Sequence, residues 1–98
     1  MDDYGQIHDI YEQSNTEVAS RLGRRFREYR SALGLTQKQV ALQSGVSVIT
    51  IVRFEKGLGN SIRLDNLIAL LRAVQRLEDI SGLVPELPQS LYSKKLTP

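Results

Sequence analysis

The chain has 98 residues, of which 41% are hydrophobic and 24% are charged, and these values suit one soluble domain with a small core. Cysteine is absent, which excludes a disulfide framework, a thiolate zinc site and a cysteine nucleophile. No apolar run approaches the roughly 18 residues that a membrane-spanning helix needs, and the acidic start is unlike a signal peptide. We therefore expect a cytoplasmic protein.

The net charge of +2 hides an uneven distribution along the chain. Residues 1–20 contain five acidic residues and no lysine or arginine, and residues 64–98 contain four basic and four acidic residues. Residues 21–63 contain nine basic residues against Glu28 and Glu55. The nine are Arg21, Arg24, Arg25, Arg27, Arg30, Lys38, Arg53, Lys56 and Arg63. This basic block suits a phosphate backbone, although charge alone fits a solvated helix face equally well.

The N-terminal third of the chain predicts an acidic arm followed by a first helix. Residues 1–14 are polar and acidic, and they predict either a short helix or a loose arm. Ser14 and Glu17 have the spacing of a capping box. Apolar residues then recur at helical spacing: Val18, Leu22, Phe26, Tyr29 and Leu33. The helix should end at Gly34, which suits a left-handed C-cap.

The next two predicted helices, Thr36–Ser44 and Ser47–Glu55, are joined by a short turn that contains Gly45. The first has a capping box of Thr36 and Gln39, and the second has a serine cap. Two capped helices around a glycine turn form a helix-turn-helix unit. The residues expected to face the core are Val40, Ala41, Val46, Ile51 and Phe54.

The remainder of the chain predicts two further helices and a tail. Leu64 to Val74 carries another apolar stripe, and Arg76–Leu83 predicts a short last helix. From Val84 onward, three prolines and several polar residues indicate an extended or disordered tail. We therefore divide the chain into an acidic arm (1–15), a helix-turn-helix domain (16–83) and a proline-containing tail (84–98).

Residues 21–75 resemble the XRE-type regulators, a family that includes lambdoid phage repressors and Cro. The matching stretches are Leu33-Gly34-Leu35-Thr36-Gln37, Val40-Ala41, Ser44-Gly45-Val46-Ser47, Ile51 and Phe54-Glu55-Lys56-Gly57. The resemblance implies an all-α, five-helix lambda-repressor-like domain with a central helix-turn-helix. It also implies an ion pair between Arg30 and Glu55.

The resemblance and the helical pattern together predict a surface that binds the major groove of double-stranded operator DNA. Gln37 is expected to contact phosphate, whereas Val48, Ile49 and Arg53 are expected to face base edges, with Thr50 reaching backbone or base. The apolar Val48 and Ile49 depart from the polar residues common in the family, and packing against neighbouring loops is an equal alternative for them. The complete predicted DNA-binding set is Gln37, Lys38, Ser47, Val48, Ile49, Thr50, Arg53, Lys56, Asn60, Ser61 and Arg63.

Partners can also be predicted. A homodimer is expected through the last helix, with Leu77, Ile80 and Leu83 at the interface. Residues 63–88 resemble HipB-type antitoxins, which implies an autoregulated operon and a HipA-like kinase toxin as partner. A phage-type repressor or a restriction-modification controller without a toxin partner is the alternative within the class. A module that binds protein through the surface of the third helix is the alternative from another class.

Catalysis is not expected. His8 is the sole histidine and lies in the acidic arm, and the chain has no glycine-rich phosphate loop and no Ser-His-Asp arrangement. We expect no cofactor and no metal.

Overall fold

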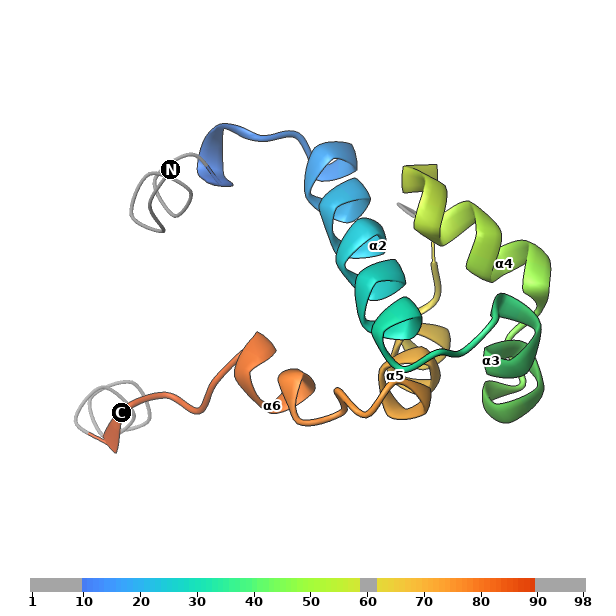
Figure 1. Cartoon of the computed structure of the whole chain (residues 1–98). Coiled ribbons are helices and arrows are strands. Elements are labelled where there is room, and N and C mark those ends of the chain that lie inside the picture. The colour runs from blue at the N-terminus through green and yellow to red at the C-terminus, as the bar shows by residue number, and fades with distance from the viewer. Residues whose placement is uncertain (1–9, 59–61, 90–98) are drawn as a thin grey trace.

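A computed structural model describes residues 10–58 and 62–89, and within these ranges it is all-helical. The 3-10 turn η1 (Ile10–Glu12) precedes the longest helix, α2 (Asn15–Ala32). The other elements are α3 (Gln37–Ser44), α4 (Val48–Arg53), a widened turn η2 (Phe54–Leu58), α5 (Leu64–Ala73) and α6 (Asp79–Leu83). Figure 1 shows α2 across the middle of the molecule, with α3, α4 and α5 gathered at one end. The predicted all-α class with five α-helices is confirmed for the described residues.

The first two capping boxes form as the sequence predicts. The Ser14 hydroxyl accepts a hydrogen bond from the Glu17 amide at 3.1 Å, and the Glu17 carboxylate accepts one from the Ser14 amide at 2.8 Å. That second bond lowers the pKa of Glu17, because it stabilises the charged form. Thr36 and Gln39 make the same reciprocal pair at the start of α3, at 3.0 and 2.8 Å. Local sequence therefore determines where both helices begin.

The turn between α3 and α4 uses the predicted glycine. Gly45 has φ +76°, a left-handed conformation that glycine adopts at little cost. Ser47 then caps α4 by accepting a hydrogen bond from the Thr50 amide at 3.1 Å. The α-helix ends at Arg53 rather than at Glu55, because the chain widens into η2 and reverses at Gly57, where φ is +84°.

The core lies where α2, α3, α4 and α5 meet. Seven apolar side chains are buried there: Phe26, Val40, Val46, Ile51, Phe54, Leu70 and Val74. Four of the five residues expected to face inward are among them, and the fifth, Ala41, packs against the cluster from its edge. The rings of Phe26 and Phe54 lie 5.5 Å apart, so they join α2 to η2.

The apolar stripe of α2 is wider than the core. Of its five members only Phe26 is buried, whereas Val18, Leu22, Tyr29 and Leu33 remain between 38% and 44% exposed. Leu22 and Tyr29 face a hollow of about 200 Å³ between α2 and α5, together with Leu67 and Leu71. Periodicity correctly predicted the helix, but it did not show that the other helices of the same chain cover only part of its apolar face.

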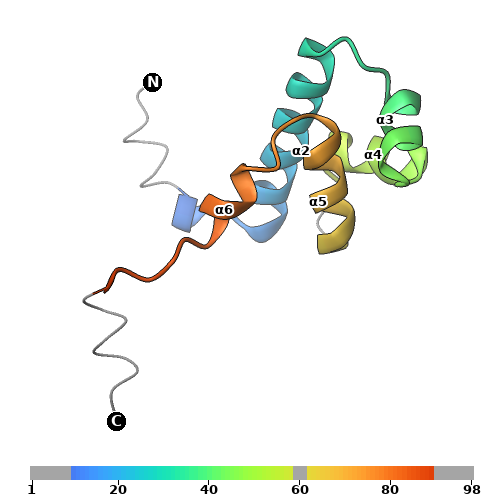
Figure 2. The same cartoon turned by 90° about the horizontal axis from the view of Figure 1, so that it is seen from below.

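The last helix is shorter than the sequence predicts. It begins at Asp79 rather than at Arg76, because the amides of Asp79, Ile80 and Ser81 bond to carbonyls three residues earlier, a 3-10 pattern, instead of four. The Arg76 side chain binds the Asp79 carboxylate at 2.7 Å and lies over the Tyr29 ring at 5.0 Å. Figures 1 and 2 show α6 and the segment after it standing away from the body of the domain. Leu83 and Val84 are consequently 62% and 83% exposed. Within the described ranges, none of the helices has the length and apolar character needed to cross a membrane.

One glycine inside α2 allows a close contact between α2 and η2. A Cβ added to Gly23 would lie 1.9 Å from the carbonyl oxygen of Phe54, far below any van der Waals distance. The absence of a side chain thus lets α2 lie directly on η2, the segment that follows α4.

We predict that Gly23→Ala destabilises the fold, although alanine is the better helix former by about 1 kcal/mol. The added methyl must displace backbone, which costs more than the helix propensity returns. Gly82→Ala is the matched control, because Gly82 also lies in a helix and a Cβ there meets nothing within 4 Å. Urea denaturation should show a lower free energy of unfolding for Gly23→Ala only. Equal effects of the two substitutions would contradict the close contact.

Candidate nucleic-acid interface

Helices α3 and α4 form the predicted helix-turn-helix and lie together at one end of the molecule, as Figure 1 shows. The buried residues Val40, Val46 and Ile51 join the two helices to the core. The opposite side of α4 faces solvent, so a partner can approach it along the length of the helix.

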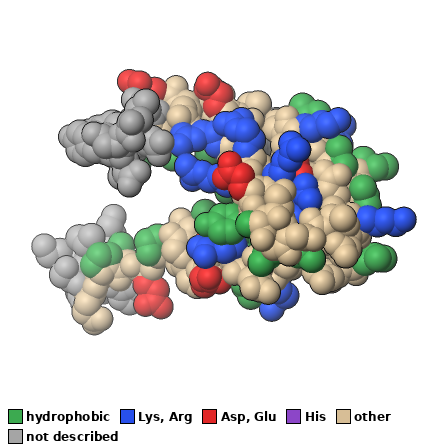
Figure 3. All heavy atoms as spheres, viewed as in Figure 1, with side chains coloured by type: hydrophobic (Ala, Val, Ile, Leu, Met, Phe, Trp, Pro, Cys, Tyr) green, Lys and Arg blue, Asp and Glu red, His purple; other side chains and the backbone are tan. Residues whose placement is uncertain are grey.

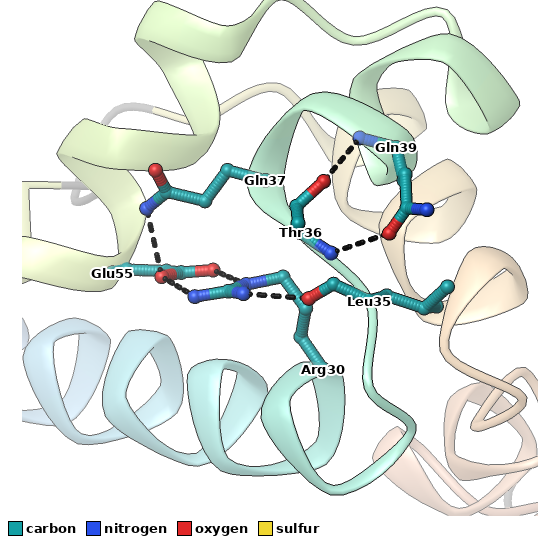
Figure 4. A network of polar contacts seen from close by, with 6 residues as sticks. All are labelled: Arg30, Leu35, Thr36, Gln37, Gln39 and Glu55. Atoms are coloured by element: carbon teal, nitrogen blue, oxygen red, sulfur yellow. Dashed lines mark hydrogen bonds and ion pairs between the residues drawn. The ribbon is translucent and has the colours of Figure 1, made fainter.

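A polar network holds α4 to the rest of the domain (Figure 4). Arg30, in the last turn of α2, binds Glu55 through two parallel hydrogen bonds of 2.6 and 2.8 Å. The third guanidinium nitrogen, Nη1, donates to the Leu35 carbonyl at 2.8 Å. The side-chain amide of Gln37 donates to the Glu55 carboxylate at 3.0 Å. One carboxylate therefore connects the end of α2, the start of α3 and the segment after α4. The ion pair expected between Arg30 and Glu55 is present.

The network is shielded from solvent. The side chains of Arg30 and Glu55 are only 11% and 3% exposed, and Glu55 is the one buried charged residue in the described ranges. The hydrogen bonds to Glu55 raise the pKa of Arg30 further above its ordinary value, so the guanidinium stays charged. A bidentate arginine–carboxylate pair fixes both distance and angle, which makes it suited to orienting one helix against another.

The solvent face of α4 combines apolar side chains with one long cation. Ile49 is 73% exposed, Val48 is 39% exposed and Arg53 is exposed one helical turn after Ile49. The hydroxyl of Thr50 accepts a hydrogen bond of 2.9 Å from the Ser47 hydroxyl, and the same Ser47 oxygen caps the helix. Packing of Ile49 against neighbouring loops, the alternative left open by the sequence, does not describe a side chain with this exposure.

The other predicted DNA-binding residues differ in exposure and in the partners that they already have. Lys38 at the start of α3 and Lys56 in η2 are both exposed. Arg63 forms an exposed ion pair with Asp65 at 2.9 Å, and such pairs are weak enough to exchange for another anion. Gln37 is half-buried, because its amide is held by Glu55. Asn60 and Ser61 lie outside the described residues.

Sequence reasoning included Arg21 and Arg24 in the basic block, but it did not place them beside η2. Arg21 and Arg24 of α2 line a hollow of about 350 Å³ together with Gly57, the residue that reverses the chain after α4. Figure 3 shows Lys and Arg side chains gathered over α2 and hydrophobic side chains along the edge where α3 and α4 lie. The cluster of arginines between residues 21 and 27 was a visible signal, but its position beside η2 depends on the packing of α2.

The residues predicted for the dimer interface lie in and before α6. Leu77 and Ile80 are half-buried and Leu83 is 62% exposed. These side chains belong to the projecting part of the molecule rather than to the helix-turn-helix. A partner on this part would therefore leave α4 free.

We predict that breaking the buried pair on one side costs about 3–5 kcal/mol of folding free energy, because the other charge is left buried and unpaired. Arg30→Met and Glu55→Met should each show this loss. The double variant Arg30→Met/Glu55→Met should lose less than either single variant, since no charge is then left in the interior. Thermal or urea unfolding of the three proteins provides the test. A double variant whose loss equals the two single losses added together would show that the residues do not act as a pair.

Comparison with known proteins agrees with this architecture. The family model HTH_3, described as helix-turn-helix, matches residues 26–78, which is more than half of the chain. Among curated proteins, none matches the chain. The matched region includes Arg30, α3, α4, Glu55 and α5, which are the elements that the buried network and the core hold together. The chain therefore belongs to the XRE-type helix-turn-helix family of DNA-binding transcription regulators.

Proposed function

We propose that this protein is a sequence-specific repressor that binds operator DNA as a homodimer, with α4 in the major groove. The observation that supports it best is the exposed outer side of α4, which carries Ile49 and Arg53 on a helix whose position is fixed by the buried Arg30–Glu55 pair. The major groove of B-form DNA is wide enough for an α-helix, and its base edges differ for each base pair. An oriented helix with outward side chains meets that requirement.

Arg53 is the proposed base reader. Its guanidinium can donate two parallel hydrogen bonds to O6 and N7 of guanine, the commonest specific contact of this kind. The side chain is exposed, and no ion pair ties it to another residue of the described chain. Arg53 is thus free to contact a base, whereas Arg30, Arg63 and Arg76 are already paired with carboxylates.

Phosphate contacts are assigned to residues at the edges of α4. Lys38 and Lys56 are exposed cations, one in the helix before α4 and one in the turn after it. Gln37 uses one amide hydrogen for Glu55, so its second hydrogen can donate to a phosphate from the first turn of α3. Such contacts position the protein without selecting a sequence, and each neutralised phosphate makes binding more sensitive to salt.

The homodimer is assigned to α6 and the segment after it. Three apolar side chains of this part are exposed: Leu83 by 62%, Val84 by 83% and Leu87 by 43%. Their exposure adds no stability to a monomer, and exposed apolar patches commonly mark interfaces. A two-fold pairing of these segments buries the same surface on both copies. We expect the two α4 helices of such a dimer to contact half-sites about 34 Å apart, as in other helix-turn-helix dimers.

The finer part of the proposal concerns the operon. The resemblance of residues 63–88 to HipB-type antitoxins supports repression of an operon that encodes this protein together with a HipA-like kinase toxin. Sequencing the genomic fragments that the protein selects would test this. Fragments that lie upstream of its own gene and of an adjacent kinase gene support the antitoxin assignment, whereas sites at unrelated promoters support a repressor without a toxin partner.

We predict that Arg53→Ala lowers affinity for the selected operator by about 1–3 kcal/mol and relaxes the preference for one base pair in each half-site. Arg72→Ala is the matched control, because Arg72 is an exposed arginine on α5, outside the helix-turn-helix. Competition gel shifts against single-base operator variants would measure both effects. Full discrimination by Arg53→Ala would exclude Arg53 as a base reader.

Salt separates this function from docking to a protein. Binding to duplex DNA should weaken steeply between low and moderate salt, because counterions are released from the phosphates. An apolar docking module that used Ile49 and Val48 on a protein surface would bind equally well or better as salt rises.

We predict that Leu83→Asp/Val84→Asp converts the dimer to a monomer, since a charge in place of each exposed apolar side chain opposes its burial. Leu64→Asp is the matched control, because Leu64 is 63% exposed but lies at the start of α5. Light scattering after gel filtration should show half the mass for the double variant alone. The same double variant should bind a two-half-site operator with the affinity expected for one half-site. A mass unchanged by the double substitution would remove α6 from the interface.

A further inference from the structure

Several polar groups of α4 and of the start of α3 make hydrogen bonds inside the protein. Thr50 receives a hydrogen bond from the Ser47 hydroxyl, and Ser47 itself caps the helix. Gln37 donates to Glu55. Ser47 is thus committed to holding the fold, whereas Thr50 keeps its hydroxyl hydrogen and Gln37 keeps its second amide hydrogen, short donors that suit phosphate. Arg53 is the long polar side chain of α4 that remains free for base edges.

The remaining outward surface of α4 is apolar. Ile49 is 73% exposed and Val48 is 39% exposed, both in the first turn of the helix. An apolar side chain held against a base edge gains little from hydrogen-bonding groups, and it leaves those groups unpaired. The apolar feature of the major groove is the methyl group at C5 of thymine, and a methyl at C5 of cytosine occupies the same place.

We propose that α4 recognises C5-methylated pyrimidines through Ile49 and Val48, next to the guanine that Arg53 contacts. This inference rests on the proposed function, because it specifies what the same helix binds in the groove. Each half-site then contains one or two C5-methyl groups whose removal weakens binding, and thymine is the ordinary source of them.

Helix geometry places this methyl relative to the guanine. Ile49 and Arg53 are four residues apart and so lie on one side of α4, about 6 Å apart along its axis. Successive base pairs rise by about 3.4 Å. The methyl group should therefore lie within about two base pairs of the guanine that Arg53 contacts, on either strand.

The test replaces single thymines of the selected operator with deoxyuridine, which removes only the methyl group. Wild-type protein should bind about threefold to fivefold more weakly when a contacted thymine is replaced, the effect expected for one buried methyl. Ile49→Ala should bind the thymine and uracil operators almost equally, because it has lost the side chain that contacts the methyl. Ile49 is mostly exposed, so its truncation leaves the fold intact.

Two controls define the source and the site of the effect. Leu42→Ala removes another highly exposed apolar side chain, on α3, and should keep the full preference for thymine over uracil. At the sensitive position, an operator with 5-methylcytosine should bind more tightly than one with cytosine, which shows that the methyl itself is recognised. If the protein prefers 5-methylcytosine over cytosine but does not prefer thymine over uracil, the methyl group that it recognises belongs to methylated DNA instead of thymine.

The outcomes distinguish this inference from the function on which it rests. If affinity depends on Arg53 but no uracil substitution within two base pairs of its guanine changes it, the methyl contact is wrong and the repressor proposal stands. If Ile49→Ala keeps the full thymine preference, a different residue contacts the methyl and the inference is overturned. If no duplex is bound specifically, both proposals fail.

Discussion

The buried carboxylate of Glu55 is the group on which the geometry of this domain depends. It accepts two hydrogen bonds from Arg30 and one from Gln37, so a single side chain sets the relative positions of α2, α3 and the segment after α4. Such a pair adds little net stability, because burying two charges costs about as much as their attraction returns. Its value is orientation. Helix α4 has only six residues, too few to be stable alone, and it needs neighbours that hold it at a defined angle.

The close contact at Gly23 holds the same segment against α2, about two helical turns before Arg30. Phe54 lies on Gly23 through its backbone and on Phe26 through its ring, so η2 is pressed against α2 at two consecutive turns. The contacts of Phe54 set how closely η2 lies on α2, and the Arg30–Glu55 pair sets the direction in which the chain leaves α4. The outer side of α4 is then presented as a rigid surface, and its exposed apolar and cationic groups keep their spacing when a duplex approaches.

Local signals predicted the beginnings of α2, α3 and α4, because a capping side chain lies three residues or fewer from the amide that it binds. The turn was likewise predicted from the tolerance of Gly45 for positive φ, and the core-facing residues of the helix-turn-helix were predicted from their helical spacing. Other features depend on contacts between distant residues. The early end of α4 depends on how η2 meets α2, and the contact of Arg76 with the Tyr29 ring of α2 forms only in the folded chain. Gln75 has φ +63°, a left-handed conformation that favours glycine, and nothing about a glutamine in the sequence predicts it. The position of Arg21 and Arg24 beside Gly57 likewise appears only after folding.

The central claim is that the outer side of α4 enters the major groove, and methylation of bound DNA with dimethyl sulfate tests it most directly. The reagent modifies guanine at N7 in the major groove and adenine at N3 in the minor groove. The account predicts protection of guanine N7 in two patches whose centres are about one helical turn apart, with adenine N3 left reactive in both. Protection of adenine N3 with guanine N7 still reactive would place the protein in the minor groove and contradict the role assigned to α4.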